Sequence, residues 1–133
     1  MPRIVRGALV QATWTGDKES MIQKHEERAH EAAKDGAQVI LFQELFYGPY
    51  FCAEQDPKWY DTAEPEDGPI ITRMREVAAQ HHMVLVVPWY EEAMTGVYYN
   101  SAAVIDADGT LLGKYRKTHI PHVGPSGISS VYE

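Results

Sequence analysis

The stretch Ala37–Phe42 (AQVILF), followed at once by Gln43 and Glu44, decides the fold. A nearly continuous apolar run of this length is typical of a strand that is covered on both faces, as in the parallel sheets of α/β proteins. In such sheets the carboxyl ends of the strands carry the functional site. Glu44 therefore stands where a chemically active group is expected.

The residues before this strand predict another strand and a helix. Ile4–Thr13 is rich in apolar and β-branched residues, as expected of a buried strand. Lys18–Lys34 carries its apolar residues on one helical face, with Asp17 as the expected N-cap and Asp35-Gly36 as the stop. Together with Ala37–Phe42, these residues predict a strand, a helix and a second strand.

The residues after the central strand predict a long loop, a helix and three strands. Residues 45–68 are rich in aromatic, Pro and acidic residues, and a structured loop longer than about 15 residues is usually functional. A helix is expected to begin at Pro69 and to end near His81-His82. The strands are expected over Met83–Trp89, Val97–Asp106 and Thr110–Lys117, the last two joined by a hairpin at Asp108-Gly109. This order predicts an α/β layered fold with a mixed sheet.

Composition narrows the classes of function. The 133 residues suffice for one domain, and 12 Lys and Arg against 19 Asp and Glu give a net charge of −7. Such a charge argues against nucleic acid or an anionic membrane as a partner. No apolar run approaches the roughly 18 to 20 residues of a membrane helix, and Arg6 interrupts any signal-peptide core. Because Cys52 is the single cysteine, no internal disulfide forms, and a cytoplasmic protein is expected.

Glu44 and Lys117 are the candidate catalytic residues, and each also has a purely structural interpretation. Apolar surroundings would raise the pKa of Glu44 and suit it as a general base, whereas a solvated Glu44 would only cap the next turn. Lys117 and Arg116 are neighbours on a strand and must point to opposite sides. An inward Lys117 would need an anionic partner such as Glu44. Alternatively, Lys114, Arg116 and Lys117 form a charged edge strand that discourages aggregation.

Several motifs resemble those of a known family. Phe42–Phe46 (FQELF) and Tyr115–Pro121 (YRKTHIP) are similar to the glutamate and lysine signatures of the nitrilase, or carbon-nitrogen hydrolase, superfamily. Leu45–Cys52 (LFYGPYFC) resembles its N-carbamoylputrescine amidase and β-ureidopropionase branch. Asp67-Gly68-Pro69 and Tyr99-Asn100-Ser101 also stand in family order, so the resemblance covers about residues 4–123.

The resemblance implies a fold and a set of roles. The fold would be a four-layer α-β-β-α sandwich with a mixed sheet, of which this chain forms the N-terminal half. In a Glu-Lys-Cys triad, Glu44 would be the general base and Lys117 the cation that stabilises the oxyanion, while a thiolate attacks the carbonyl carbon. Tyr47 and Tyr50 would line the substrate pocket, and Asn100 would give structural support. No metal or organic cofactor is implied, and full-length members are homo-oligomers.

The nucleophile and the last residues depart from the family pattern. The family's cysteine lies well downstream of the lysine, and the sequence continues for only sixteen residues after Lys117. We expect Cys52 to be a packed, non-catalytic thiol, so the nucleophile is expected to be missing from this chain. The truncated hydrolase domain is expected over residues 1–124 and a divergent tail over 125–133. A shifted reading frame turns one encoding of Pro125–Ser130 into Phe-Trp-Asp-Lys-Phe, close to the family's continuation, which indicates an out-of-frame tail.

The sequence thus predicts an amidohydrolase that cleaves the C–N bond of a small N-carbamoyl amine or N-carbamoyl amino acid. Two alternatives stay open beside it. One is a catalytically inactive fragment or a non-catalytic binding module that covers its exposed face with a partner. The other is a minimal hydrolase in which Cys52 is the nucleophile.

Overall fold

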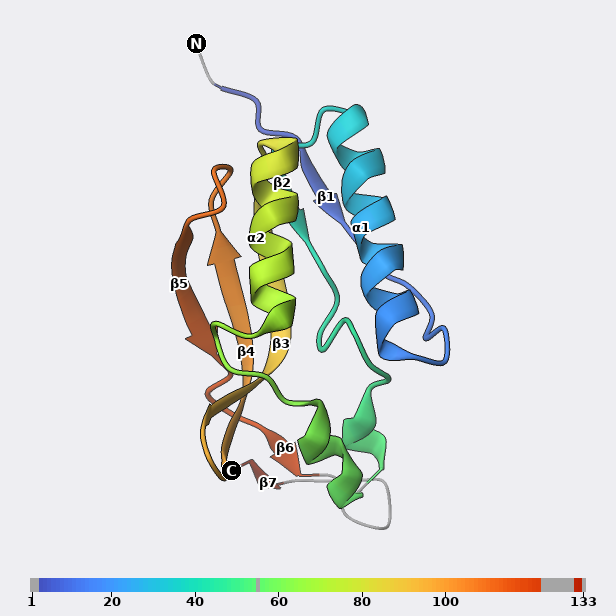
Figure 1. Cartoon of the computed structure of the whole chain (residues 1–133), viewed down its shortest axis with the longest axis vertical. Helices are drawn as coiled ribbons and strands as arrows, with labels where there is room; N and C mark the ends of the chain where they lie inside the picture. Colours follow the sequence, from blue (N-terminus) through green and yellow to red (C-terminus); the bar gives the residue numbers. More distant parts are fainter. Residues whose placement is uncertain (1–2, 55, 123–130, 133) are drawn as a thin grey trace.

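The computed structural model describes residues 3–54, 56–122 and 131–132 (Figure 1). Five strands form one mixed sheet in the order β1-β2-β3-β4-β5, with β1, β2 and β3 parallel and the last three antiparallel. The strands are β1 (Gly7–Leu9), β2 (Val39–Leu41), β3 (Val84–Met94), β4 (Val97–Ile105) and β5 (Leu111–Arg116). The helices are α1 (Lys18–Lys34) and α2 (Pro69–His81), and β6 (Pro121–His122) pairs with β7 (Val131–Tyr132). The predicted α/β class with a mixed sheet is confirmed.

Both helices have the expected bounds because local signals fix their ends. The Asp17 carboxylate accepts a hydrogen bond from the Ser20 amide at 2.9 Å and so caps α1. Pro69 opens α2, and the Glu64 carboxylate accepts from the Ile70 amide at 2.8 Å. The helix then ends at His82, which has a left-handed backbone with φ of +50°.

The strands differ in length from the sequence-based prediction. β1 and β2 have three residues each, shorter than the apolar runs that contain them. β3 instead continues to Met94, five residues beyond the predicted end at Trp89. Its extension pairs with β4, with Tyr90 opposite Asn100 and Glu92 opposite Tyr98. Long-range pairing therefore overrides the acidic residues that end the apolar pattern.

The long loop between β2 and α2 is packed. It contains two short 3₁₀ helices, η1 (Phe51–Ala53) and η2 (Pro57–Thr62), at the lower end of the molecule in Figure 1. The Phe51 and Trp59 rings stack with 5.7 Å between their centroids. The predicted tail at 125–133 falls, apart from residues 131–132, outside the described residues, and its reading frame stays a prediction.

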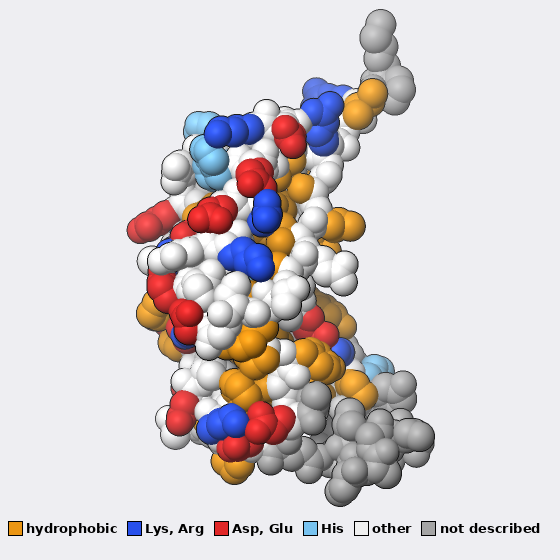
Figure 2. All heavy atoms as spheres, turned by 90° about the vertical axis from the view of Figure 1, so that its right-hand side faces the viewer, with side chains coloured by type: hydrophobic (Ala, Val, Ile, Leu, Met, Phe, Trp, Pro, Cys, Tyr) orange, Lys and Arg blue, Asp and Glu red, His pale blue; other side chains and the backbone are white. Residues whose placement is uncertain are grey.

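The two faces of the sheet have different environments. Both helices pack against one face (Figure 1), where the core residues Ile40, Leu85 and Trp89 are fully buried. The other face, here called the open face, carries Leu9, Leu41, Val86, Val104 and Tyr115, as the strand register shows. Leu9 is 83% exposed and Leu41 is 39% exposed. Figure 2 shows hydrophobic side chains at the surface between charged ones on one side of the molecule. Among the described residues, no helix is both long and apolar enough to cross a membrane.

Candidate active site

Glu44 and Lys117 meet at one end of the sheet. Glu44 comes three residues after β2, and Lys117 follows β5 directly. The Lys117 Nζ donates to Glu44 Oε1 at 2.8 Å, although 73 residues separate the two. Their side chains are 33% and 40% exposed. The anionic partner that the sequence analysis sought for Lys117 is therefore Glu44.

Asn100 of β4 joins this pair. Its Nδ2 donates to Glu44 Oε1 at 2.6 Å, and its backbone oxygen accepts from the Lys117 amide at 2.8 Å. Asn100 lies on the open face, because it alternates along β4 with Ser101, which faces the helix side. The site is thus built on the face that the helices do not cover.

A left-handed residue aims Glu44 at that face. Leu45 has φ of +52° and is only 2% exposed. A branched side chain avoids this backbone conformation unless its surroundings impose it. On either side of this turn, Phe42 and Phe46 enter the core, where both rings contact His25. The turn at Leu45 lets two core aromatic residues flank an exposed carboxylate.

The expected direction of the Glu44 pKa shift is wrong. Partial burial does raise the pKa of Glu44, but the hydrogen bonds from Lys117 and Asn100 lower it by more, so the net pKa lies below its ordinary value. The hydrogen bond with Glu44 raises the pKa of Lys117, although partial burial acts in the opposite direction. Both groups are therefore charged at neutral pH. The apolar Leu-Phe-Tyr that follows Glu44 does not surround the carboxylate, because Leu45 and Phe46 pack into the core on the other side of the turn.

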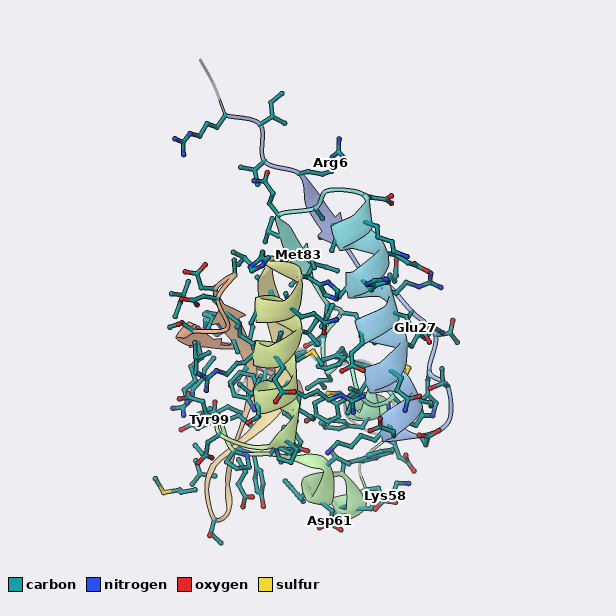
Figure 3. All side chains as sticks on the ribbon, turned by 45° about the horizontal axis from the view of Figure 1, so that its top comes forward. Arg6, Glu27, Lys58, Asp61, Met83 and Tyr99 are labelled. Carbon is teal, nitrogen blue, oxygen red and sulfur yellow. The ribbon has the colours of Figure 1, made fainter. Side chains whose placement is uncertain are left out.

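The other cations of β5 point to the helix side of the sheet, as strand alternation predicts. Lys114 and Arg116 donate to the Glu91 carboxylate at 2.6 and 2.7 Å, and Ser101 donates at 2.5 Å. Burial alone would raise the pKa of Glu91, but these bonds lower it to about 2. The Arg116 guanidinium also lies 3.9 Å from the ring centre of Tyr99, which Figure 3 labels. Lys114 and Arg116 of this strand are thus held in ion pairs with Glu91. This role of Glu91 was not predicted from the sequence.

Tyr47 is a core residue. It is 3% exposed, and its hydroxyl donates to the Thr62 carbonyl at 3.1 Å and accepts from the Tyr90 amide at 3.0 Å. Its ring lines a small apolar hollow with Trp14, Phe51 and Trp59, and Glu44 is not among the lining residues. Lys18 and Thr62 line the same hollow. Thr62 ends η2, on which Figure 3 labels Asp61. The structure therefore does not bring Tyr47 to the Glu44–Lys117 pair.

Tyr50 and Cys52 lie on the side of Glu44 and Lys117. Tyr50 is half exposed, and the charges of Glu44 and Lys117 both act on its hydroxyl. Cys52 is partly buried, and the charges of Glu44 and Lys117 also affect the pKa of its thiol. Burial raises the pKa of the Cys52 thiol, with a smaller opposing effect of Tyr50. A protonated thiol is a weak nucleophile, in keeping with the expectation of a non-catalytic cysteine.

Comparison with known proteins identifies the family. Residues 6–132 match the carbon-nitrogen hydrolase family. The chain belongs to this family. A crystal structure of a carbon-nitrogen hydrolase from Helicobacter pylori G27 superposes with a TM-score of 0.86 at 28% identity, over 94% of this chain and 43% of that one. The predicted family and fold are confirmed, and the sheet and helices correspond to part of a carbon-nitrogen hydrolase domain.

Relatives in this family carry amidase names. N-carbamoylputrescine amidase from Solanum lycopersicum is 43% identical over 131 residues, which are 98% of this chain and 43% of the relative. Beta-ureidopropionase from Arabidopsis thaliana is 30% identical, over 98% of this chain and 35% of the relative. The chain thus spans less than half the length of these carbon-nitrogen hydrolases.

Proposed function

We propose that this chain supplies the general base, Glu44, and the oxyanion-stabilising cation, Lys117, of a hydrolase that cleaves the C–N bond of an N-carbamoyl compound. One observation carries the proposal: the carboxylate and the ammonium lie 2.8 Å apart at the end of the open face. An amide hydrolase needs both a proton acceptor and a fixed positive charge next to the carbonyl. The Glu44 and Lys117 side chains are partly exposed and lie outside the core, whereas the Glu91 carboxylate is buried.

The proposed reaction proceeds through a thioester-like acyl enzyme. A cysteine thiol from outside residues 1–133 gives its proton to Glu44 while the sulfur attacks the carbamoyl carbon. The carbonyl oxygen becomes an oxyanion beside the Lys117 ammonium. When the tetrahedral intermediate collapses, protonated Glu44 gives the proton to the leaving nitrogen, and water then cleaves the acyl enzyme by the reverse transfers. Hydrolysis of the acyl enzyme releases a carbamic acid, and this acid breaks its remaining C–N bond to give carbon dioxide and the second nitrogen product. The final products are therefore ammonia, carbon dioxide and the free amine.

The names of two relatives support the proposed substrate class. The tomato protein is named for N-carbamoylputrescine and the Arabidopsis protein for β-ureidopropionate. Both names describe a terminal urea group on an aliphatic chain. Tyr50 is half exposed, and it follows Glu44 by six residues in the same loop, so we assign it to the wall of the substrate pocket. Tyr47 supports the loop that carries Tyr50 and does not contact substrate.

A second candidate function is a binding module without turnover. The exposed Leu9, Leu41 and Tyr115 on the open face favour it, since large exposed apolar patches usually mark an interaction surface. Such a module would bind an N-carbamoyl ligand near Glu44 and Lys117 and release no ammonia.

The test is ammonia release from N-carbamoylputrescine and N-carbamoyl-β-alanine. Two proteins are compared: the 133-residue chain, and residues 1–124 joined to the part of the tomato relative that follows its matching segment. We expect turnover by the fusion only. Turnover by the 133-residue chain that is abolished by Cys52→Ser would show that Cys52 is the nucleophile. Ligand binding without turnover in either protein would favour the binding module.

A further inference from the structure

The two donors at Glu44 converge on one of its two oxygens. Lys117 Nζ and Asn100 Nδ2 both donate to Oε1, at 2.8 and 2.6 Å. Within residues 3–54, 56–122 and 131–132, no hydrogen bond to Oε2 accompanies them. A carboxylate can only accept hydrogen bonds, so the side chain of Asn100 must present its amide NH₂ to Glu44. Among the described residues, two donors anchor Oε1 and none binds Oε2.

Asn100 is the more rigid of the two donors. Lys117 has a long side chain with several rotatable bonds, whereas Asn100 has a short one and lies within β4. The backbone of β4 is fixed on both sides, with Asn100 opposite Tyr90 of β3 and its oxygen bonded to the Lys117 amide. Asn100 therefore holds Glu44 through its side chain and Lys117 through its backbone.

Glu91 is a carboxylate with a purely structural role, and it serves as a comparison for Glu44. Glu91 is 1% exposed, and both of its oxygens are engaged: Lys114 and Arg116 bind Oε1, while Ser101 and Arg116 bind Oε2. No lone pair is left open toward solvent. Glu44 differs because its hydrogen bonds with the part of the chain that the structure describes all go to Oε1.

We propose that Asn100 is a positioning residue for the base: it anchors Oε1 of Glu44 and so leaves Oε2 as the oxygen that takes up and returns the proton. The catalytic meaning of this inference rests on the proposed function. The positioning itself does not, because it concerns a contact within the 133 residues.

The test is an NMR titration of the Glu44 carboxyl carbon in the 133-residue chain. Asn100→Ala removes a donor to the carboxylate, and Asn100→Asp replaces it with a like charge, so the titration midpoint of Glu44 should move upward in both and further in Asn100→Asp. Ser101→Ala is the matched control, since it removes a donor from Glu91 on the opposite face of the same strand. It should leave the Glu44 midpoint unchanged.

A second signal needs no variant and therefore does not depend on variant folding. One side-chain amide proton of Asn100 should shift with pH at the same midpoint as Glu44 in the unaltered chain. An amide proton that does not follow Glu44, or a Glu44 midpoint that is equal in the unaltered chain and a folded Asn100→Ala variant, would overturn the inference.

The catalytic role of Asn100 is tested in the fusion protein described above. There Asn100→Ala should lower kcat about tenfold, less than the roughly 10²–10⁴-fold that a general base contributes, because Glu44 itself remains. It should also move the acid limb of the pH–rate profile upward with little change in KM. An unmoved acid limb in an active fusion would overturn the catalytic role. A fusion without turnover would count against the proposed function alone, because the titration still decides whether Asn100 positions Glu44.

Discussion

The His25 ring of α1 meets the Phe46 ring edge-on, with 4.8 Å between their centroids, two residues beyond Glu44. His25 is fully buried, and its Nδ1 lies 2.8 Å from the Met21 carbonyl oxygen. Its Nε2 is buried with no hydrogen-bond partner among the described residues. A neutral ring that donates from Nδ1 fits this site, and a charged ring would leave a buried, unpaired donor.

The first prediction is that acid destabilises the protein through His25. Burial lowers the pKa of His25 in the folded state, so below the ordinary value of about 6.5 the unfolded state binds more protons. The contribution of the neutral ring to stability is therefore complete above about pH 6.5 and is lost as pH falls through the lower folded pKa. Urea unfolding at pH 7 and pH 5 measures this loss.

The control for His25 is a second histidine on the other helix. His25→Phe should reduce the fall in unfolding free energy between pH 7 and pH 5. His81→Gln, which removes a histidine at the end of α2, should reduce it less, because His81 is less buried. Equal pH dependence in the unaltered chain and His25→Phe would refute the prediction.

The second prediction concerns the buried Glu91. Glu91→Gln leaves Arg116 without its carboxylate partner and leaves Lys114 with Glu66 alone. It should lower the unfolding free energy by about 2–3 kcal/mol, less than for fully buried pairs because both cations are partly exposed. The pKa of about 2 means that the unaltered chain keeps this contribution above the unfolded carboxyl pKa and loses it as pH falls toward 2.

Chemical denaturation at pH 7 measures the effect of Glu91→Gln. Glu31→Gln is the matched control, because Glu31 pairs with Arg28 on the exposed surface of α1 and should cost about 0–1 kcal/mol. A loss for Glu91→Gln no larger than that for Glu31→Gln would show that the buried ion pairs add nothing to stability.

The third prediction concerns the stability of two variants at Leu45: the glycine variant should be more stable than the alanine variant. Both Leu45→Ala and Leu45→Gly lose the buried side chain, at a cost of about 2–5 kcal/mol. Glycine adopts the positive φ of this position without the strain that alanine retains, worth about 1 kcal/mol. Leu45→Gly should therefore be more stable than Leu45→Ala, the reverse of the usual order within a regular helix or strand.

Thermal or urea unfolding of the two Leu45 variants gives the order directly. Val87→Ala and Val87→Gly serve as controls, because Val87 is buried in the interior of β3. There alanine should be the more stable of the two. Finding alanine more stable at position 45 as well would mean that the left-handed turn carries no strain.

The sequence was sufficient for the elements whose signals are local. The apolar periodicity and the Asp17 and Pro69 ends predict both helices, and Asp108-Gly109 predicts the hairpin. The extension of β3 to Met94 was not predictable from its own residues, because it depends on pairing with β4 and on cations that neutralise Glu91.

The meeting of Glu44 and Lys117 was predictable from the sequence, whereas the direction of the Glu44 pKa shift was not. The resemblance brought Glu44 and Lys117 together correctly in space. The pKa of Glu44 was predicted in the wrong direction, because hydrogen bonds from Lys117 and Asn100, 73 and 56 residues away, outweigh the effect of burial. The burial of Tyr47 was not predictable from its neighbours, because its hydroxyl is held by the backbone of Thr62 and Tyr90, which lie 15 and 43 residues away.

The central claim is that Glu44 is the base and Lys117 the cation of a carbon-nitrogen hydrolase. The most direct measurement is kcat for N-carbamoylputrescine hydrolysis by the fusion protein, unaltered and with Glu44→Gln. Glutamine keeps the shape and can still accept a hydrogen bond from Lys117, but it cannot take up a proton. We predict a kcat at least about a hundredfold lower in Glu44→Gln, as expected for a general base. A kcat within about twofold of the unaltered fusion would contradict the account.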